Sequence, residues 1–547
     1  MAFLQDSPQL PHPYRSDRLL LALLDRALPA ERRAALDADL DALGDYALMA
    51  WQRATTTTRR KPVLTQWDAW GQRVDRIELT PAWQEGATLT TRHAVLAAGH
   101  GDSAHGRLEE FARVYLYHLA SEFYTCPLAM TDGAATAIKA SGNRELIERV
   151  LPHFLSRDPA TFWLSGQWMT ETAGGSDVGH TETVARQDAA GQWRLYGRKW
   201  FSSAVVGEAA LALARPEGAA AAGTAALALF YVETMDGARR KSELVIDRLK
   251  DKLGTQELPT AEIHLDGLPA WPLGELANGV RQVAPMLNVT RTWNAICAVA
   301  SMARAIALAR DFAERRRAFG RPLIEQPLHA QTLADMQAEF EGAFALAFEI
   351  AHLLGRVEHD AAQPHEPALL RLLTPLAKLW TGKLAVQMCS EALECFGGAG
   401  YIEDTGLPQL LRDAQVYAIW EGTTNVLSLD SLRALAGDSL GALRTACASW
   451  LDGNDDMHAA SAIRQTLDAA ARWLDQHAAA RDTLEAGARG LAFTLARCAA
   501  AALLARQASW SNQHADPRPA AALRRFVHLG LDRLVTPDAD NTALLLG

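Results

Sequence analysis

One glutamate has neighbours that suit it to proton transfer. Glu421 follows Ile419 and Trp420 and precedes Gly422 in the run IWEGTTN. Apolar surroundings remove hydration from a carboxylate, which makes a carboxyl group a better proton acceptor near neutral pH. A glutamate at the start of a helix, where the helix dipole favours negative charge, would have the same neighbours. The run therefore predicts either a general base or a helix-start glutamate.

A second cluster combines adjacent glycines with hydroxyl side chains. Residues 167–178 have the sequence QWMTETAGGSDV. The glycines allow the backbone to turn closely around a ligand, and the hydroxyls of Thr170 and Ser176 can donate to ring or phosphate oxygens. A surface turn between two strands explains the same composition. The segment is a candidate ligand loop, with the plain turn as its alternative.

Three further segments have two interpretations each. GRKWFSS at 197–203 is typical of a strand that lines a cofactor, although aromatic residues in strands more often fill a core. The cations of RRRAFGRPL at 315–323, at the end of a predicted helix, suit either the helix dipole or the paired oxygens of a pyrophosphate. The glycines of CFGGAGY at 395–401 admit a nucleotide or form an interhelical turn.

Several common site patterns are absent from the sequence. No strand is followed by a G-x-G-x-x-G helix start and no Walker A sequence occurs, so nicotinamide and ATP sites lack their required context. The 16 His have no metal-ligand spacing, and Ser or Cys nucleophile motifs are missing. We expect no metal site.

Helices must position most of these residues. Apolar residues recur at helical spacing from Ser16 to about Ser165, then from Val280 through 327–358 and 366–396 to near Leu435, and again over 440–547. Between Gln167 and about Leu273, short alternating segments predict a compact β domain. We expect an α+β, mainly helical fold. Its four domains are residues 1–165 (an N-terminal arm and helices), 166–278 (the β domain), 279–438 (a helical bundle with Glu421) and 439–547 (an extra helical domain).

Composition favours a soluble globular protein. The 547 residues are 49% hydrophobic and 22% charged, with a formal charge of -10, which argues against general binding to phosphate backbones. Six scattered Cys without a CxxC pair indicate reduced thiols. No secretory signal pattern begins the sequence, and its most apolar stretch is interrupted by Arg215 and Glu217. We expect a cytoplasmic protein that does not enter a membrane.

Taken in order, the clusters resemble the signature blocks of the acyl-CoA dehydrogenase superfamily over roughly residues 100–435. The arm, the Trp-Glu-Gly and Trp-Phe-Ser elements and the extra domain resemble its AidB-like members. The resemblance implies an acyl-CoA dehydrogenase-like fold with an N-terminal helical domain, a central β-barrel, a helical bundle and an additional C-terminal helical domain. It also implies an FAD-dependent oxidoreductase that performs α,β-dehydrogenation of an acyl-CoA thioester with Glu421 as the base.

The resemblance also assigns roles to matching positions. Some relatives place the base on the preceding long helix, where this chain has Thr290; Thr cannot remove the proton, which favours Glu421 with Arg291 near it. Arg316 would meet the FAD pyrophosphate across a subunit interface, and the glycine run would contact the adenine of a neighbouring subunit's cofactor. The implied FAD contacts are Met169, Thr170, Ser176, Phe201, Ser203, Arg316, Phe319, Gln326, Gly397, Gly398, Thr423 and Asn425. The implied substrate contacts are Ser176, Thr290, Arg291 and Gly422.

Partners follow from the same resemblance. It implies an acyl-CoA substrate, a role in fatty acid metabolism, reoxidation by an electron-transfer flavoprotein or by oxygen, and a homotetramer built as a dimer of dimers. One alternative is an AidB-like DNA-binding flavoprotein of the alkylation-damage response with weak dehydrogenase activity. The region from Leu440 onward holds 11 Arg, no Lys and 11 acidic residues, which argues against DNA binding. A non-catalytic flavin or acyl-CoA sensor is the other alternative.

Overall fold

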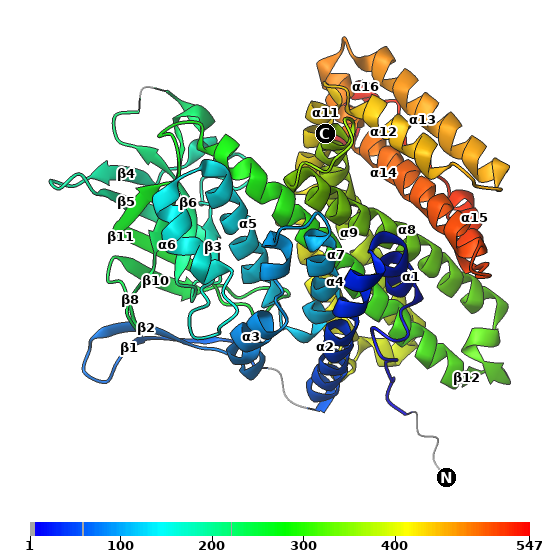
Figure 1. The fold of residues 1–547 in the computed structure, drawn as a ribbon, viewed down its shortest axis with the longest axis horizontal. Coiled ribbons are helices and arrows are strands. Elements are labelled where there is room, and N and C mark those ends of the chain that lie inside the picture. Colours follow the sequence, from blue (N-terminus) through cyan, green and yellow to red (C-terminus); the bar gives the residue numbers. More distant parts are fainter. Residues whose placement is uncertain (1–5, 57–59, 220) are drawn as a thin grey trace. The chain divides into compact units, whose positions relative to one another are not determined.

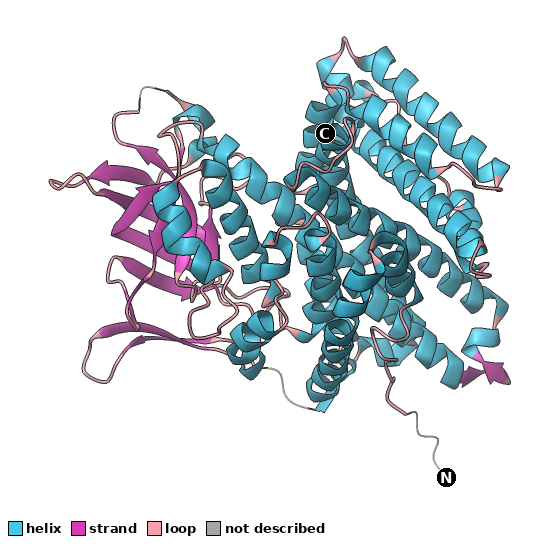
Figure 2. Cartoon of the chain, in the orientation of Figure 1, coloured by secondary structure: helices cyan, strands magenta, loops and turns pink. Residues whose placement is uncertain are grey.

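The mainly helical fold expected from the sequence is confirmed, and most strands lie in one segment of the chain (Figures 1 and 2). The computed structural model describes residues 6–56, 60–219 and 221–547, so the first five residues of the expected N-terminal arm lie outside the described residues. The chain forms two compact units. Unit 1 comprises Met1–Asp45, Ser103–Phe111 and Asn294–Gly547, and unit 2 comprises Tyr46–Asp102 and Ala112–Trp293.

Unit 2 contains a seven-stranded sheet that closes on itself. The strand order is β10-β11-β5-β4-β6-β3, and β7 pairs with both β6 and β11, which joins the sheet into a barrel-like ring. The predicted β domain at about 167–273 is thereby confirmed. The strands are β3 (Ser165–Trp168), β4 (Val184–Gln187), β5 (Trp193–Ser203), β6 (Ala209–Pro216), β7 (Ala228–Glu233), β10 (Leu244–Leu249) and β11 (Thr260–Pro272), with a short pair β8 (Met235–Asp236) and β9 (Arg239–Arg240).

Strand alternation divides the apolar side chains between two cores. Along β6, Ala210, Ala212 and Ala214 lie in the core inside the sheet. The intervening Leu211 and Leu213 lie in a second core with side chains of α5, α6 and the start of α7. Because successive side chains of a strand point to opposite faces, a strand buried on both faces is apolar throughout. Helices of this unit are α3 (Pro81–Arg92), α5 (Thr125–Ser141) and α6 (Arg144–Phe154).

A β-hairpin interrupts the N-terminal region that the sequence pattern predicts as mostly helical. Strands β1 (Val63–Trp67) and β2 (Arg73–Glu78) pair antiparallel around a turn at Asp68–Gly71. The hairpin is fixed to β10: the Arg73 guanidinium donates to the Ile246 carbonyl at 2.6 Å, and the Ile246 amide donates to Asp75 at 3.0 Å. An isolated hairpin is marginally stable, so these long-range bonds explain why it forms here.

Unit 1 is built around a helical bundle. Its predicted helices at 327–358 and 366–396 are confirmed as α8 (Pro327–Glu358) and α9 (Glu366–Cys395). Proline at the first or second position of each helix favours these starts, because the first amide of a helix needs no partner. The other bundle helices are α10 (Leu407–Ala414) and α11 (Thr424–Leu435); α2 (Ala30–Thr56), α4 (Gly106–Tyr117) and α7 (Gly279–Arg315) cross the boundary between the units.

The predicted helical character of 440–547 is confirmed, and ion pairs join this region to α8. Arg497 donates to both carboxylate oxygens of Glu339 at 2.7 and 2.8 Å. Arg506 and Arg525 bind two other α8 carboxylates, each at 2.5 Å. The region is therefore part of the same compact unit as the bundle. Its helices are α12 (Ser439–Trp450), α13 (Met457–His477), α14 (Arg481–Asn512), α15 (Arg518–His528) and α16 (Ala539–Leu546).

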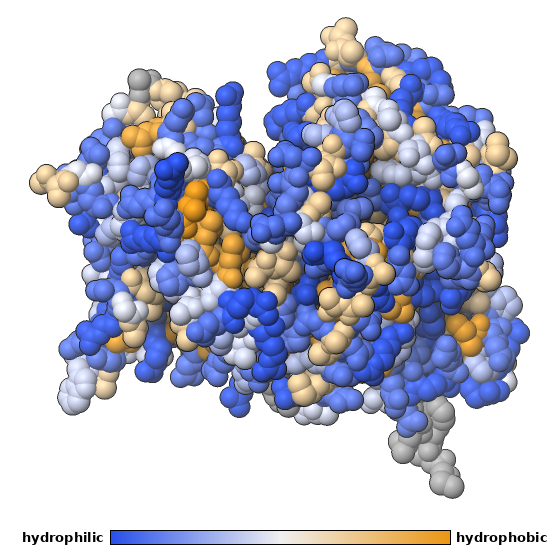
Figure 3. Space-filling model, in the orientation of Figure 1, coloured by the Kyte–Doolittle hydropathy of each residue, from blue (hydrophilic) through white to orange (hydrophobic). Residues whose placement is uncertain are grey.

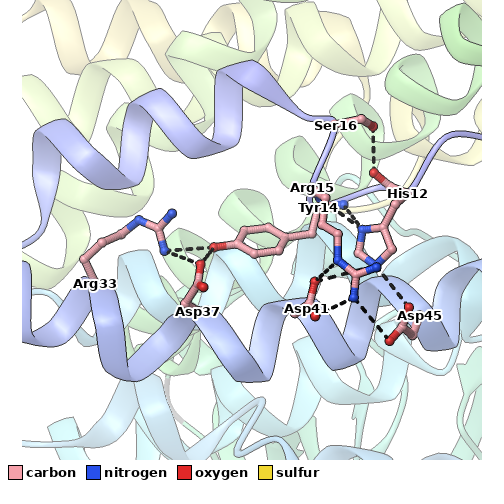
Figure 4. A network of polar contacts seen from close by, with 8 residues as sticks. All are labelled: His12, Tyr14, Arg15, Ser16, Arg33, Asp37, Asp41 and Asp45. Carbon is pink, nitrogen blue, oxygen red and sulfur yellow. Dashed lines mark hydrogen bonds and ion pairs between the residues drawn. The ribbon is translucent and has the colours of Figure 1, made fainter.

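The described part of the N-terminal arm is fixed to α2 by a polar network (Figure 4). The Tyr14 hydroxyl donates to Asp37, and Arg33 contacts both of these groups. Nearby, the Arg15 guanidinium binds Asp41 through two contacts of 2.6 Å. Helix α1 (Arg18–Ala27) follows, with the Asp17 carboxylate capping its first amides. These bonds give the arm a defined course along α2.

Two described helices are long and apolar enough to cross a bilayer by length and composition, namely α7 and α14, and 83% of the apolar window of each is buried in the protein. Burial within the units accounts for their composition. Hydrophilic side chains cover most of the face visible in Figure 3. Within the described residues, no disulfide joins any of the six cysteines, and no group of three or more His, Cys, Asp or Glu suits a metal ion.

Candidate active site

In unit 2 the structure brings the segments 167–178 and 197–203 together. The loop after β3 folds back on itself, since the Glu171 amide donates to the Gly174 carbonyl at 3.1 Å and the Gly174 amide donates to the Glu171 carbonyl at 3.2 Å. The Trp200 amide of β5 donates to the Thr170 carbonyl at 2.9 Å. A Cβ at Gly174 would lie 2.3 Å from the Asp177 carbonyl oxygen, so this close turn needs glycine.

A buried ion pair beneath this turn was not predicted. Glu171 and Lys199 are 4% and 1% exposed, and the Lys199 ammonium contacts the carboxylate at 2.5 Å. The same carboxylate accepts from the Thr183 hydroxyl at 2.6 Å and the Glu182 amide at 2.7 Å. Burial opposes its ionisation, but Lys199 and these hydrogen bonds outweigh burial and lower the pKa of Glu171. The pair fixes the loop to the barrel.

A β-bulge turns two aromatic side chains outward on β5. Ser202 pairs with Ala261 and Lys199 with Ile263, so Trp200 and Phe201 together oppose the single residue Glu262. Trp200 is 37% and Phe201 47% exposed. The adjacent Ser203 hydroxyl lies 3.1 Å from the Thr260 hydroxyl. The sequence left open whether these aromatic residues fill a core; here both are accessible to a ligand.

A cation lies against this aromatic surface. The Lys250 ammonium is 3.9 Å from the Trp200 ring centroid and 4.5 Å from that of Phe201. It also contacts Glu262 at 2.6 Å, and hydrogen bonds from Arg248 and Lys250 lower the pKa of Glu262 to about 2. The aromatic pair is therefore held in place by cation–π contacts and by an ionised carboxylate.

The other predicted positions in unit 2 differ in accessibility. Ser176 is exposed and Thr170 is half-buried, whereas Met169 packs against the second core, which the sheet shares with α5, α6 and α7. Thr290 and Arg291 lie on α7 and are buried. A Cβ at Gly133 of α5 would lie 3.1 Å from the Thr290 methyl carbon, so the two helices approach closely at this position.

In unit 1, Arg316 follows α7 and precedes a tight hairpin. Strands β12 (Arg317–Ala318) and β13 (Arg321–Pro322) pair with only Phe319 and Gly320 between them. Both turn residues have positive φ, +49° and +86°, as type I′ turns require. The Gln326 amide donates to the Ala318 carbonyl at 2.8 Å and so holds the hairpin. Phe319 is left 97% exposed at the tip.

The glycine run lies close to the end of α7. The rings of Phe312 and Phe396 stack with their centroids 4.2 Å apart. Gly397 and Gly398 are exposed, and a Cβ at either would meet nothing within 4 Å. Gly400 differs, because its Cβ would lie 2.0 Å from the Leu393 carbonyl oxygen. The segments 315–323 and 395–401 thus approach each other, and Gly397 and Gly398 have open space around them.

The segment that carries Glu421 has a strained backbone. Glu421 has φ +57° and Gly422 φ +105°, a region that side-chain-bearing residues adopt rarely and at an energetic cost. Glu421 is half-buried and lies before Thr423, the N-cap residue of α11, so it does not belong to the first turn of that helix. The helix-start alternative is therefore wrong. Ile419, expected to help form an apolar pocket, is 61% exposed.

Side chains from two distant helices fix this segment, and sequence reasoning missed both. Asn294 of α7 donates to the Tyr417 carbonyl at 3.1 Å and accepts from the Trp420 indole at 2.5 Å. Lys378 of α9 is fully buried and donates to the Gly422 carbonyl at 2.5 Å. The backbone is thus held on both sides of Glu421. The only sequence signal was a lone lysine in the apolar run LLTPLAKLW.

Thr423 and Asn425 are exposed at the start of α11. Asn425 accepts from the Arg489 guanidinium of α14 at 3.4 Å, so the extra C-terminal region touches the segment next to Glu421. The predicted positions therefore form two groups, one in each unit. The group in unit 2 offers an aromatic surface with hydroxyls, and the group in unit 1 offers cations, open glycines and a constrained glutamate.

Comparison with family models covers nearly the whole chain. Residues 9–158 match the adaptive response protein AidB N-terminal domain, and residues 166–268 match the acyl-CoA dehydrogenase middle domain. Residues 277–436 match the acyl-CoA dehydrogenase C-terminal domain, and residues 445–541 match the acyl-CoA dehydrogenase 11 C-terminal domain-like model. The chain belongs to the acyl-CoA dehydrogenase superfamily, a group of oxidoreductases, and to its AidB-like members.

Individual relatives agree with this assignment. Acyl-CoA dehydrogenase family member 11 of Caenorhabditis elegans is 39% identical over 534 residues, which cover 93% of this chain and 86% of that protein. Putative acyl-CoA dehydrogenase AidB of Escherichia coli is 34% identical, covering 68% of this chain and 69% of that protein. The crystal structure of Caenorhabditis elegans ACDH-11 in complex with C11-CoA superposes with a TM-score of 0.91 at 38% identity, covering 96% of this chain and 92% of the other. The Bd2924 apo-form superposes with a TM-score of 0.84 at 41% identity, covering 93% and 100%.

Proposed function

We propose that this protein is an FAD-dependent acyl-CoA dehydrogenase that oxidises an acyl-CoA thioester between its α- and β-carbons, with Glu421 as the general base. The observation that carries the proposal is the strained Glu421 backbone, held on one side by Asn294 and on the other by Lys378. Strain of this kind persists only where surrounding bonds maintain it, and it is concentrated at functional sites.

The residues present fit FAD. Phe201 offers an accessible aromatic face, and the neighbouring Ser203 hydroxyl and Thr170 loop offer polar atoms at its edge. In unit 1, the Arg316 guanidinium suits a pyrophosphate, and the open backbone at Gly397 and Gly398 can approach a nucleotide. Aromatic faces, hydroxyls, a guanidinium and open amides are the groups that a flavin ring and a dinucleotide phosphate chain require.

The chain supplies the groups for proton removal, and the bound cofactor supplies the acceptor for the hydride. When bound, FAD supplies the acceptor for the hydride that leaves the β-carbon. Glu421 takes the α-proton, and in this proposal its own amide donates to the thioester oxygen as negative charge develops there. The bonds from Asn294 and Lys378 restrain the backbone segment that carries Glu421, so less orientational freedom is lost when the substrate binds.

The finer features of the substrate and the assembly belong to the same proposal. The relative solved with C11-CoA supports an acyl chain of about eleven carbons. Phe319 is 97% exposed and the glycines at 397 and 398 are open, which supports cofactor sites completed by a neighbouring subunit in a homotetramer. We further propose a cytoplasmic enzyme of fatty acid metabolism that passes its electrons to an electron-transfer flavoprotein.

The alternative, a DNA-binding flavoprotein, has support from the AidB matches. Within the described residues, however, much of the positive charge of the C-terminal region is bound by carboxylates, because Arg497, Arg506 and Arg525 pair with α8 and Arg444 pairs with Asp468. Guanidinium groups engaged in this way are not available to displace counterions from DNA. This observation favours the dehydrogenase.

An anaerobic titration with acyl-CoA tests the proposal. The purified flavoprotein should lose its oxidised-flavin absorbance with acyl-CoA, most readily with an acyl chain of about eleven carbons, as in the C11-CoA complex of the relative. Glu421→Gln should retain flavin and be reduced at least about a hundredfold more slowly, the smallest usual contribution of a general base. Glu394→Gln, an exposed carboxylate on α9, is the matched control and should behave as the parent.

Two outcomes would contradict the proposal. A parent protein that binds flavin but is reduced by no acyl-CoA from short branched to long straight chains would exclude the dehydrogenase. Salt-sensitive retention of that protein on duplex DNA would then favour the DNA-binding alternative. Normal reduction of Glu421→Gln would instead retain the enzyme and reject Glu421 as its base.

A further inference from the structure

The interior of α9 contains a cation that packing alone does not explain. Lys378 is fully buried on α9, and its ammonium donates to the main-chain carbonyl of Gly422 at 2.5 Å. Taking an ammonium group out of water is costly, whereas an apolar side chain of similar volume would fill the same space without that penalty. The residue type therefore indicates a requirement for the hydrogen bond itself.

The same face of α9 makes a second close approach to the segment before the base. Gly382 lies four residues, about one helical turn, after Lys378, and residues so spaced share a face. A Cβ at Gly382 would lie 2.6 Å from the Tyr417 carbonyl oxygen. Gly382 thus leaves room for one end of the segment 417–422, at Tyr417. Lys378 binds the other end of this segment, at Gly422.

The bonded carbonyl lies at a sensitive point of the backbone. Gly422 has φ +105°, and glycine rotates about its backbone bonds more freely than any other residue. Glu421, immediately before it, is held at φ +57°. A charged donor on the Gly422 carbonyl limits this rotation, and a charge-assisted hydrogen bond is about twice as strong as a neutral one. The Lys378 bond consequently restrains the Glu421 backbone.

We propose that Lys378 is a positioning residue for the dehydrogenation: by binding the Gly422 carbonyl it holds Glu421 in the orientation that removes the α-proton. This inference rests on the proposed function of Glu421. Lys378 does not itself exchange a proton with the substrate. A displacement of about 1 Å in a reacting group lowers a rate by roughly a hundredfold, so loss of this bond should slow proton removal while binding is preserved.

The first experiment measures how firmly the backbone around Glu421 is held, and it does not depend on enzyme activity. Lys378→Met and its matched control Lys383→Met, a half-buried lysine on the same helix, are compared with the parent by hydrogen–deuterium exchange and mass spectrometry. Lys378→Met should increase exchange in the peptide covering 417–423, and Lys383→Met should not. Unchanged exchange in this peptide would overturn the inference whatever the enzyme's reaction. Lys378→Gln, which keeps a neutral donor on a shorter side chain, provides a second variant if the methionine variant folds poorly.

The second experiment isolates proton removal. An acyl-CoA analogue with sulfur in place of the β-carbon can lose its α-proton but cannot donate a hydride, and its anion gives a long-wavelength charge-transfer band with oxidised flavin. Per bound flavin, Lys378→Met should form this band roughly ten to a hundred times more slowly than the parent. Its affinity for the analogue should stay within about threefold, because substrate binding does not use this bond, and Lys378→Gln should recover part of the rate.

The outcomes separate this inference from the proposed function. Lower flavin content or melting temperature with an unchanged rate per bound flavin would reduce Lys378 to a structural residue and overturn the inference alone. A parent that forms no band and is reduced by no acyl-CoA would overturn both proposals. Slower band formation in Lys378→Met, with analogue affinity retained, would support the positioning role.

Discussion

The buried pair of Glu171 and Lys199 provides a quantitative test of how the candidate flavin loop is held. Lys199→Met removes a cation that is 1% exposed and leaves the Glu171 carboxylate, 4% exposed, without its ionic partner. Breaking a buried pair in this way costs about 3–5 kcal/mol. For a unit of this size each kcal/mol lowers Tm by roughly 2–4 °C, so we expect a decrease of about 10 °C.

The assay is thermal unfolding of the whole protein, followed by near-ultraviolet circular dichroism of its tryptophans and by release of flavin fluorescence. The double variant Glu171→Gln, Lys199→Met replaces the ions with neutral side chains of similar size and should recover most of the loss. Folding lowers the pKa of Glu171 from its ordinary value of 4.5. The ionised carboxylate therefore stabilises the parent above pH 4.5, and this stabilisation is lost as the pH falls below that value. The difference in Tm between the parent and Lys199→Met should therefore become smaller as the pH is lowered.

A change of less than about 2 °C in Lys199→Met, corresponding to under 1 kcal/mol, would refute this reasoning. Additive effects of the two single variants would refute it as well, since coupled charges must give a non-additive cycle. A large decrease in Tm with unchanged flavin affinity at low temperature would show that the pair stabilises the protein. It would also show that the pair is not needed to hold the loop after β3 for flavin binding.

Three further changes address unit 1. Arg497→Met leaves Glu339 without its bidentate partner, so calorimetry should show a Tm several degrees lower, with most of the loss recovered by adding Glu339→Gln. Gly382→Ala introduces a Cβ 2.6 Å from the Tyr417 carbonyl oxygen and should slow flavin reduction at least about tenfold in stopped-flow traces; a parent-like rate would contradict the close approach. Gly398→Leu places its side chain in open space, so circular dichroism should be unchanged while gel filtration and flavin content change; unaltered assembly and flavin content would argue against a neighbouring subunit at this surface.

Regular elements of the fold were predictable where one pattern ran unbroken. The helices at 327–358 and 366–396 follow from long apolar periodicity with proline near each start. The hairpin at 63–78 was missed because its strands are short and partly polar, and its stabilising bonds come from Ile246, more than 170 residues away. The sequence of the hairpin itself does not indicate a hydrogen-bond partner so far away in the chain.

The candidate site shows the same division. Residue types and order singled out Glu421 as the candidate base, but its strained backbone depends on Asn294, 126 residues before the Trp420 that it binds, and on Lys378, 44 residues before the Gly422 that it binds. The spacing of apolar residues does not fix the rotation of a long buried helix about its axis closely enough to predict which way one side chain points. The β-bulge that exposes both Trp200 and Phe201 was equally hidden, because strict alternation predicts that adjacent side chains point to opposite faces.

The ion pairs between α8 and the last hundred residues limit how the protein can be dissected. Asp335, Glu339 and Glu349 each take their counter-ion from beyond residue 438. A shortened chain of ordinary dehydrogenase length would keep these carboxylates and lose their guanidinium partners, along with the apolar surface that α14 covers. If such a shortened chain were inactive, the loss would show only that the helical bundle is damaged, and not what the added helices do. The contribution of the added helices is better measured by exchanging solvent-facing residues of α13 while the contacts with α8 stay intact.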